Sequence, residues 1–317
     1  TASFKVGGAQ FSRRIRIETI KPNRMKAKMD FNSDLLTDDR LNSPINIEAN
    51  WLHGAPAKDA QVKILMNLKP TNTTFKKFEQ YQFQYPNSNF EVEESEVYNG
   101  KVDENGKTKF NLKISAQNAP GMINAQFVTR VFEKSGDFSI ITQSVKYSPY
   151  DSYVGLKMQT NGESGWYTTD KDYKVDLVTV DQFGKPISQS NVKVKIYKLG
   201  WRWWWNSYGD NLASYLGSTT QSPVSTEYVN TDEKGLGTFE MSVKYKSYDD
   251  NGRYLIVAED PQSGHKTGKI VYFSKWYGRL GGGSVGANIL SFSSDKDKYK
   301  VGEDIQINIP SSKNGRA

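Results

Sequence analysis

The pentapeptide Val102-Asp103-Glu104-Asn105-Gly106 recurs later in the chain as Thr231-Asp232-Glu233-Lys234-Gly235. In each copy a phenylalanine, Phe110 or Phe239, follows the Gly by four residues and begins an alternating apolar run. An Asp-x-x-Gly segment in this setting is typical of a tight turn between two β-strands. The matched spacing therefore predicts a repeated β-unit.

Two further landmarks recur in the same order. Alternating apolar runs begin at Ile45, Val175 and Ile305, each 130 residues after the one before. The segments 54–56 and 184–186 both read Gly-x-Pro, and each is followed by another alternating run. Because Gly permits unusual backbone angles and Pro fixes one, we expect a hairpin-type turn at each. Three landmarks in one order indicate tandem copies of one domain.

The repeat sets the domain boundaries that we expect. Residues 22–148 and 149–278 should each form one sandwich of about seven short strands, without a sustained helix. Residues 1–21 should hold the terminal strand of a preceding domain, with Phe11 to Ile20 in that strand, and a linker. Residues 279–317 should be a Gly-rich linker and the incomplete start of a third domain. The predicted fold class is all-β, with tandem immunoglobulin- or fibronectin-III-like antiparallel β-sandwiches in a longer array.

Composition supports two modest cores and narrows the classes of function. Hydrophobic residues make up 36% of the 317 residues and aromatic residues 13%, which favours strands over a single large core. Cysteine is absent, so disulfides and thiol chemistry are excluded within these residues. The net charge is +7, but lysines alternate with apolar residues, as in 192–196, so we expect no nucleic-acid partner. No apolar run reaches 18 residues, so we expect membrane attachment only through an anchor elsewhere.

Several segments resemble one family when they are taken in order along the chain. They are 6–11, 17–24, Trp51-Leu52-His53-Gly54-Ala55-Pro56-Ala57, Tyr98 to Gly106, Lys198 to Trp205, 212–215 and Tyr299-Lys300-Val301-Gly302-Glu303. Together they resemble the macroglobulin domains of bacterial α2-macroglobulin-like proteins. The second unit is most similar to the form found in Bacteroidetes.

The resemblance implies macroglobulin-type sandwiches within a large extracytoplasmic protease trap, periplasmic or surface-anchored, and a lipoprotein at full length. In that family a protease cleaves a bait segment, and a Cys–Gln thioester can then acylate the attacker. A chain without cysteine cannot carry the thioester. The resemblance therefore implies a non-catalytic scaffold segment of an endopeptidase inhibitor. Its partners would be target proteases, reached through the parent protein, and the neighbouring macroglobulin domains.

A tryptophan cluster, formed by Trp201, Arg202, Trp203, Trp204 and Trp205, is the candidate interface or ligand platform. On a strand, alternate residues share a face, so three of the four indoles would lie together. If the indole rings are exposed, they could stack on the faces of sugars, since exposed tryptophan is typical of binding hot spots. Buried, they would form an aromatic wedge between neighbouring sandwiches, with the guanidinium stacked on a ring. We favour the wedge.

No other segment has the pattern of a catalytic, metal or cofactor site. The acidic run 91–96 lacks the spacing of a calcium loop. His53 and His265 occupy non-equivalent turns, and no neighbouring pattern suggests a triad or zinc site. The glycines 281–283 lack the Gly-Lys-Ser/Thr ending of a phosphate loop. We expect no enzyme activity and no cofactor. The alternative functions are a surface carbohydrate-binding or adhesive module and an architectural immunoglobulin-like stalk.

Overall fold

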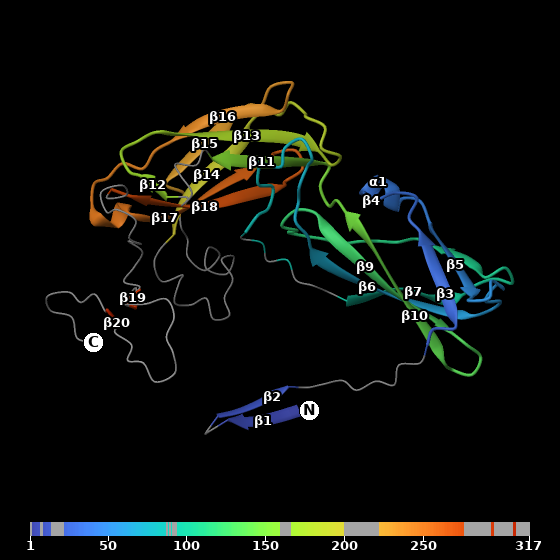
Figure 1. The fold of residues 1–317 in the computed structure, drawn as a ribbon. Coiled ribbons are helices and arrows are strands. Elements are labelled where there is room, and N and C mark those ends of the chain that lie inside the picture. Colours follow the sequence, from blue (N-terminus) through green and yellow to red (C-terminus); the bar gives the residue numbers. More distant parts are fainter. Residues whose placement is uncertain are drawn as a thin grey trace. The chain divides into compact units, whose positions relative to one another are not determined.

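Among the residues that the computed structural model describes, β-strands are by far the main secondary structure (Figure 1). The described residues are 2–6, 9–13, 22–86, 88, 90, 94–158, 166–199, 222–275, 293–294 and 307–308. They form two sandwiches and two short antiparallel pairs. The pairs are β1 (Ala2–Val6) with β2 (Ala9–Arg13), and β19 (Ser293–Ser294) with β20 (Ile307–Asn308).

Sandwich one, the first of the two, consists of a three-stranded and a five-stranded sheet. The three-stranded sheet has the order β3 (Met25–Asp30), β5 (Ile45–Trp51), β8 (Lys107–Phe110). The five-stranded sheet has the order β4 (Leu35–Leu36), β10 (Phe138–Tyr147), β9 (Ile123–Phe132), β6 (Gln61–Pro70), β7 (Glu94–Lys101). All pairs are antiparallel except β4 with β10. One helical turn, α1 (Asp38–Leu41), follows β4.

Sandwich two repeats this arrangement strand for strand. Its three-stranded sheet has the order β11 (Ser152–Met158), β13 (Tyr173–Asp181), β16 (Leu236–Met241). Its five-stranded sheet has the order β12 (Trp166–Thr168), β18 (Lys266–Ser274), β17 (Gly252–Glu259), β14 (Val192–Leu199), β15 (Ser225–Val229). A 3-10 turn spans Tyr248–Asp250. The predicted all-β fold class is confirmed.

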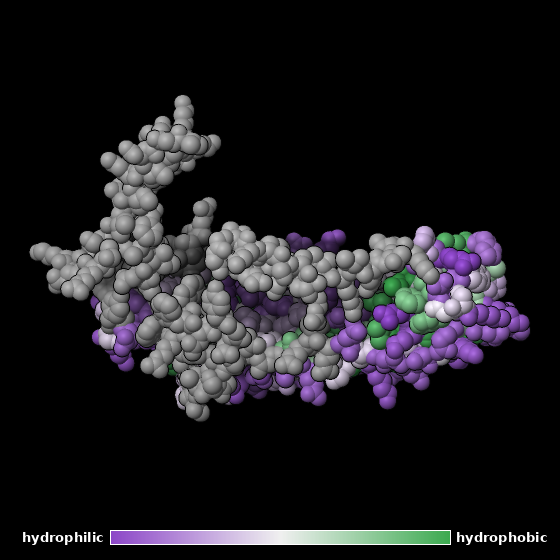
Figure 2. All heavy atoms as spheres, turned by 90° about the horizontal axis from the view of Figure 1, so that it is seen from below, coloured by the Kyte–Doolittle hydropathy of each residue, from purple (hydrophilic) through white to green (hydrophobic). Residues whose placement is uncertain are grey.

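Alternation along the strands builds each core. Every second residue of β9 is buried, and β3 alternates between buried and exposed positions in the same way. Facing side chains of the two sheets, such as Ile47 and Phe127, then fill the interior of sandwich one. Hydrophilic residues (purple) predominate on the described surface that Figure 2 shows, with a smaller apolar area (green). This is the distribution expected when one face of each sheet is buried.

The two Asp-x-x-Gly turns have nearly identical geometry. Asp103 Oδ1 accepts hydrogen bonds from the backbone N–H groups of residues 105 and 107, both at 2.8 Å. Asp232 does the same for residues 234 and 236, at 2.8 and 2.9 Å. Gly106 and Gly235 both have φ +72°, and a Cβ on either would lie 2.3 Å from a backbone carbonyl oxygen. Local turn chemistry therefore explains why this motif repeats.

The Gly-x-Pro segments form tight antiparallel turns, with bridges between Asn50 and Pro56 and between Val180 and Pro186. Contrary to the expectation from sequence, the long strands on either side of each turn do not pair with each other. Strands β5 and β6 belong to different sheets, and so do β13 and β14. At the first turn Trp51 N–H donates to Ala55 O at 2.8 Å, and the chain then crosses to the opposite sheet. The pairing was predicted wrongly because two successive strands need not belong to one sheet. The sheet that a strand joins depends on partners far away in the sequence.

The strand count also differs from the expected seven. Within the described residues each sandwich has eight strands, including β4 with two residues and β12 with three. Strands that short cannot show alternation. Of the strand expected over Phe11 to Ile20, β2 ends at Arg13, and 14–20 lie outside the described residues. The boundaries at 21/22, 148/149 and 278/279 remain predictions.

Candidate functional site

A long connection between β6 and β7 leaves sandwich one and packs on sandwich two. It spans residues 71–93, and we call its part 75–86 the strap. Its described residues 71–86 form no strand or helix, and connections that long without secondary structure are uncommon in compact domains unless they have a function. The strap reads Phe-Lys-Lys-Phe-Glu-Gln-Tyr-Gln-Phe-Gln-Tyr-Pro, with an aromatic residue at every second position near its end.

The backbone of the strap extends the smaller sheet of sandwich two. Gln82 N–H donates to Leu156 O, and Leu156 N–H donates to Gln82 O, both at 2.9 Å. Leu156 lies in β11, an edge strand, so the strap satisfies polar groups that would otherwise be unpaired. This is the hydrogen-bond pattern of strand addition.

The same strap residues also bond to the larger sheet of sandwich two. Gln82 Nε2 donates to Gly268 O at 2.6 Å, and Thr267 Oγ1 donates to Gln82 O at 2.8 Å. Gly268 N–H donates to Gln84 O at 3.1 Å. Both partners lie in the first half of β18, beyond the residues that pair with β12. We call the gap between β11 and this half of β18 the seam, and the strap fills it.

Aromatic packing anchors the strap. The Phe83 side chain is 1% exposed, and its ring meets that of Phe75 edge-on with centroids 4.8 Å apart. A Cβ on Gly155 would lie 2.6 Å from the Phe83 ring, so only glycine leaves space for it there. The buried cluster at this joint comprises Phe75, Tyr81, Phe83 and Met122 from sandwich one and Tyr153, Val178 and Val180 from sandwich two. The strap is therefore bound by both backbone and side chain.

His265 bonds to β11 of its own sandwich through one ring nitrogen and to the strap of sandwich one through the other. The side chain is fully buried, and its Nδ1 accepts from Val154 N–H at 3.1 Å. Because Nδ1 accepts, the proton of the neutral ring lies on Nε2, which donates to Phe83 O at 3.1 Å. Burial lowers the pKa of His265 to about 3. A neutral ring with both nitrogens bonded to backbone cannot serve as a catalytic base.

Asp260 holds the turn that places His265. Its carboxylate is fully buried and accepts from Gln189 Nε2 at 2.6 Å and from Ser263 Oγ at 3.1 Å. Ser152 Oγ also donates to it. The Asp260 N–H in turn donates to His265 O at 2.9 Å. This hydroxyl, carboxylate and imidazole do not form a relay, because Ser152 bonds to the carboxylate rather than to the ring.

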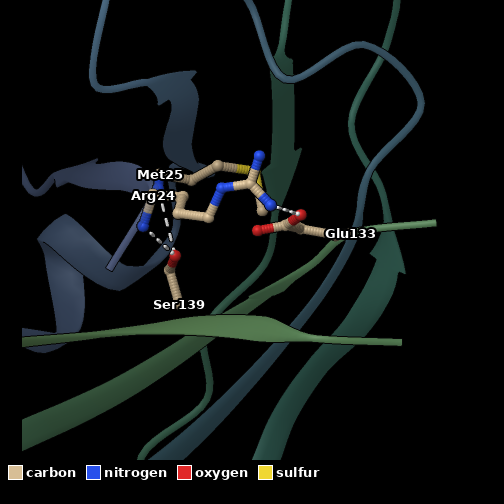
Figure 3. Close-up of polar contacts among 4 residues, drawn as sticks. All are labelled: Arg24, Met25, Glu133 and Ser139. Carbon is tan, nitrogen blue, oxygen red and sulfur yellow. Dashed lines mark hydrogen bonds and ion pairs between the residues drawn. The ribbon is translucent and has the colours of Figure 1, made fainter. Parts of the chain in front are cut away.

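Sandwich one closes the equivalent seam with its own side chains. Ser139 Oγ accepts from the N–H groups of Arg24 and Met25, both at 3.0 Å, and Arg24 pairs with Glu133 at 2.8 Å (Figure 3). Further along β3, Gln143 Oε1 accepts from Met29 N–H at 2.8 Å. The edge of β3 is thus satisfied by β10 without a strap.

Two family models match this pair of sandwiches. Residues 23–144 match the bacterial alpha-2-macroglobulin MG5 domain, and residues 155–276 match bacterial macroglobulin domain 6. The chain belongs to the bacterial alpha-2-macroglobulin family. The predicted family is confirmed, while the Bacteroidetes form stays a prediction. An alpha-2-macroglobulin of Rickettsia conorii is 22% identical over 308 residues, which are 93% of this chain and 15% of that protein.

Solved alpha-2-macroglobulin structures share the fold. The native conformation of the Escherichia coli protein matches with a TM-score of 0.54 and 15% identity, over 96% of this chain and 19% of that one. The trypsin-activated form of the Escherichia coli protein matches with a TM-score of 0.55 and 14% identity, over 92% of this chain and 19% of that one. The chain thus corresponds to a small part of these proteins, 15% of the Rickettsia relative and 19% of each Escherichia coli structure.

The candidate residues of the macroglobulin segment fall in different places. Trp201 to Trp205 and the first three residues of the acidic run 91–96 lie outside the described residues. His53 is exposed, and its ring stacks on Trp51 at 6.2 Å. No group of three His, Asp or Glu side chains suited to a metal occurs in the described part. Nor does any helix among those residues have the length and apolar character needed to cross a membrane.

Sequence reasoning missed the strap and the role of His265. One signal was available in β13, where Val178 and Val180 occupy the outward face of a sheet. The equivalent positions of β5 are the polar residues Glu48 and Asn50. Apolar residues on both faces of one repeat indicate a cover that the other repeat lacks.

Proposed function

We propose that these two macroglobulin domains are a non-catalytic scaffold segment of an alpha-2-macroglobulin-like endopeptidase inhibitor. The parent protein would be extracytoplasmic and would meet target proteases through segments outside this chain. The family match in MG5–MG6 order carries the proposal. Activation of the Escherichia coli relative by trypsin supports a protease as the partner of the whole protein.

The chemistry of the joint supports a structural role. The buried imidazole, carboxylate and hydroxyl of His265, Asp260 and Ser152 are engaged in hydrogen bonds that hold turns and the strap. A scaffold needs joints that keep their geometry, and buried, fully bonded polar groups provide that. The joint is therefore suited to transmitting force or position between neighbouring domains.

We extend the proposal to Trp201 to Trp205, which lie outside the described residues. They fall in the connection between β14, which ends at Leu199, and β15, which begins at Ser225. The strap falls in the equivalent connection of sandwich one, between β6 and β7. The shared topological position favours the domain-wedge role over a sugar platform. Glycan-array binding that Trp203→Ala abolishes would instead support the carbohydrate-binding alternative.

The decisive experiment uses the parent protein. It would be incubated with trypsin, with and without methylamine pretreatment, and analysed on a denaturing gel for a conjugate heavier than either partner. A methylamine-sensitive conjugate would establish a thioester trap with this segment in its framework. Cleavage without a conjugate, and with trypsin still active on large substrates, would contradict the proposal and leave the fold resemblance alone.

A further inference from the structure

The seam of sandwich two is built to accept an added chain segment. Strand β11 is the edge of its sheet, and within the described residues only β12 borders the far side of β18, along the last three residues of that strand. The first half of β18 and the outer edge of β11 therefore present backbone groups that need partners. The strap provides those partners through Gln82 and Gln84.

Two glycines shape the seam for an aromatic segment. A Cβ on Gly155 would lie 2.6 Å from Cε1 and Cζ of Phe83, and a Cβ on Gly268 would lie 3.0 Å from Cδ of Pro86. The seam thus has a recess at Gly155 for the ring of Phe83 and space at Gly268 for Pro86, three positions later. His265 adds a fixed donor for the carbonyl of the anchoring phenylalanine. Backbone pairing combined with a side-chain recess is how edge strands recognise extended peptides.

Sandwich one shows that the fold does not require such a site. Met29 pairs with Ile47, and Leu156 pairs with Leu177. Ile47 and Leu177 lie at the same position of the two repeats, so Met29 and Leu156 are equivalent. At Met29 the side-chain amide of Gln143 both accepts from N–H, at 2.8 Å, and donates to C=O, at 3.3 Å. A glutamine side chain thus replaces the pairing that the backbone of Gln82 gives to Leu156. The open seam is a property of sandwich two alone.

We propose that the seam of sandwich two is a peptide-recognition site for an extended segment with alternating aromatic and glutamine residues. The strap is its ligand in cis, and recognition by the seam is what couples the two sandwiches. The site depends on the local contacts of residues 81–86 and not on covalent continuity with β6 and β7. The same segment therefore binds in trans when the strap is removed. This inference stands on the joint itself and does not depend on protease trapping.

The test is complementation with the peptide Phe-Glu-Gln-Tyr-Gln-Phe-Gln-Tyr-Pro, residues 78–86. In the full 317-residue chain these nine positions are replaced by Gly and Ser, and binding of the labelled peptide is followed by fluorescence anisotropy. We expect saturable binding to the strapless chain and none to the unaltered chain, whose seam is filled. A peptide with Ala in place of Phe83 should bind at least about 10-fold more weakly. Gly155→Val in the strapless chain should abolish binding by filling the recess.

Equal binding of the two peptides, or binding that Gly155→Val leaves unchanged, would overturn the proposal. If the strapless chain does not fold, the full chain with Phe83→Ala replaces it. The peptide should then raise the Tm of that chain, and a scrambled peptide of the same composition should not. A Tm that responds equally to both peptides, or to neither, would equally overturn the proposal.

Discussion

The side-chain amide of Gln143 bonds both backbone polar groups of Met29, accepting from its N–H at 2.8 Å and donating to its C=O at 3.3 Å. In sandwich two the backbone of Gln82 bonds Leu156, the equivalent residue, in the same two-way pattern. One sandwich therefore closes its own edge, and the other is closed by its neighbour. The two domains are therefore not interchangeable, because sandwich one provides the strap and sandwich two binds it.

Removal of the amide should open the edge of sandwich one. Gln143→Ala leaves the partly buried N–H of Met29 without its acceptor, so we expect a loss of about 1–3 kcal/mol in unfolding free energy. Urea unfolding followed by circular dichroism measures it. Thr142→Ala, at the neighbouring exposed position, is the matched control and should change stability by less than about 0.5 kcal/mol. Equal stability of the two variants would show that water replaces the amide without cost.

The strap anchor should dominate the stability of the joint. Phe83 is 1% exposed and Phe183 is 69% exposed, so the same substitution tests burial directly. Phe83→Ala should cost about 3–5 kcal/mol, whereas Phe183→Ala should cost less than about 0.5 kcal/mol. The measurement is denaturant unfolding of the full chain, with tryptophan and tyrosine fluorescence as the signal. Comparable losses in the two variants would mean that the strap contributes little.

Much of the fold was predictable because its signals are local. The Asp103 and Asp232 turns are complete within five residues, so their motif could be read directly. The strap could not be predicted in the same way. Its Gln82 side chain bonds a residue 186 positions away, and a single sequence contains no record of that pairing. The extra apolar positions Val178 and Val180 indicate that β13 is covered, but they do not identify the cover.

The repeated turn glycines should be equally intolerant of a side chain. Gly106 and Gly235 share φ +72°, and a Cβ on either would lie 2.3 Å from a carbonyl oxygen. Gly136 has φ +89° but nothing within 4 Å of its Cβ position. A substitution there therefore measures backbone strain without a steric clash. Gly136→Ala should cost about 1 kcal/mol, and each of the other two substitutions clearly more than about 2 kcal/mol. Thermal unfolding of the three variants gives the comparison, and three similar Tm values would exclude the clash.

The buried imidazole should make stability depend on pH. Burial lowers the pKa of His265 to about 3 in the folded chain, below its ordinary value of 6.5. Between these values the unfolded state binds a proton that the folded state does not, so stability rises with pH. As pH falls through 6.5 toward 3, the folded state should lose up to about 1.4 kcal/mol per pH unit from this group. Protonation also turns Nδ1 into a donor, which removes the bond from Val154 N–H.

Urea unfolding at several pH values between 4 and 7.5 tests this dependence, with His265→Gln as the comparison. The variant should be less stable at pH 7.5, because it loses one of the two backbone bonds, yet its stability should fall less steeply on acidification. The difference between the two curves isolates the histidine from carboxylates that titrate in both proteins. Parallel curves for His265→Gln and the unaltered chain would show that His265 is not the group that couples folding to protons.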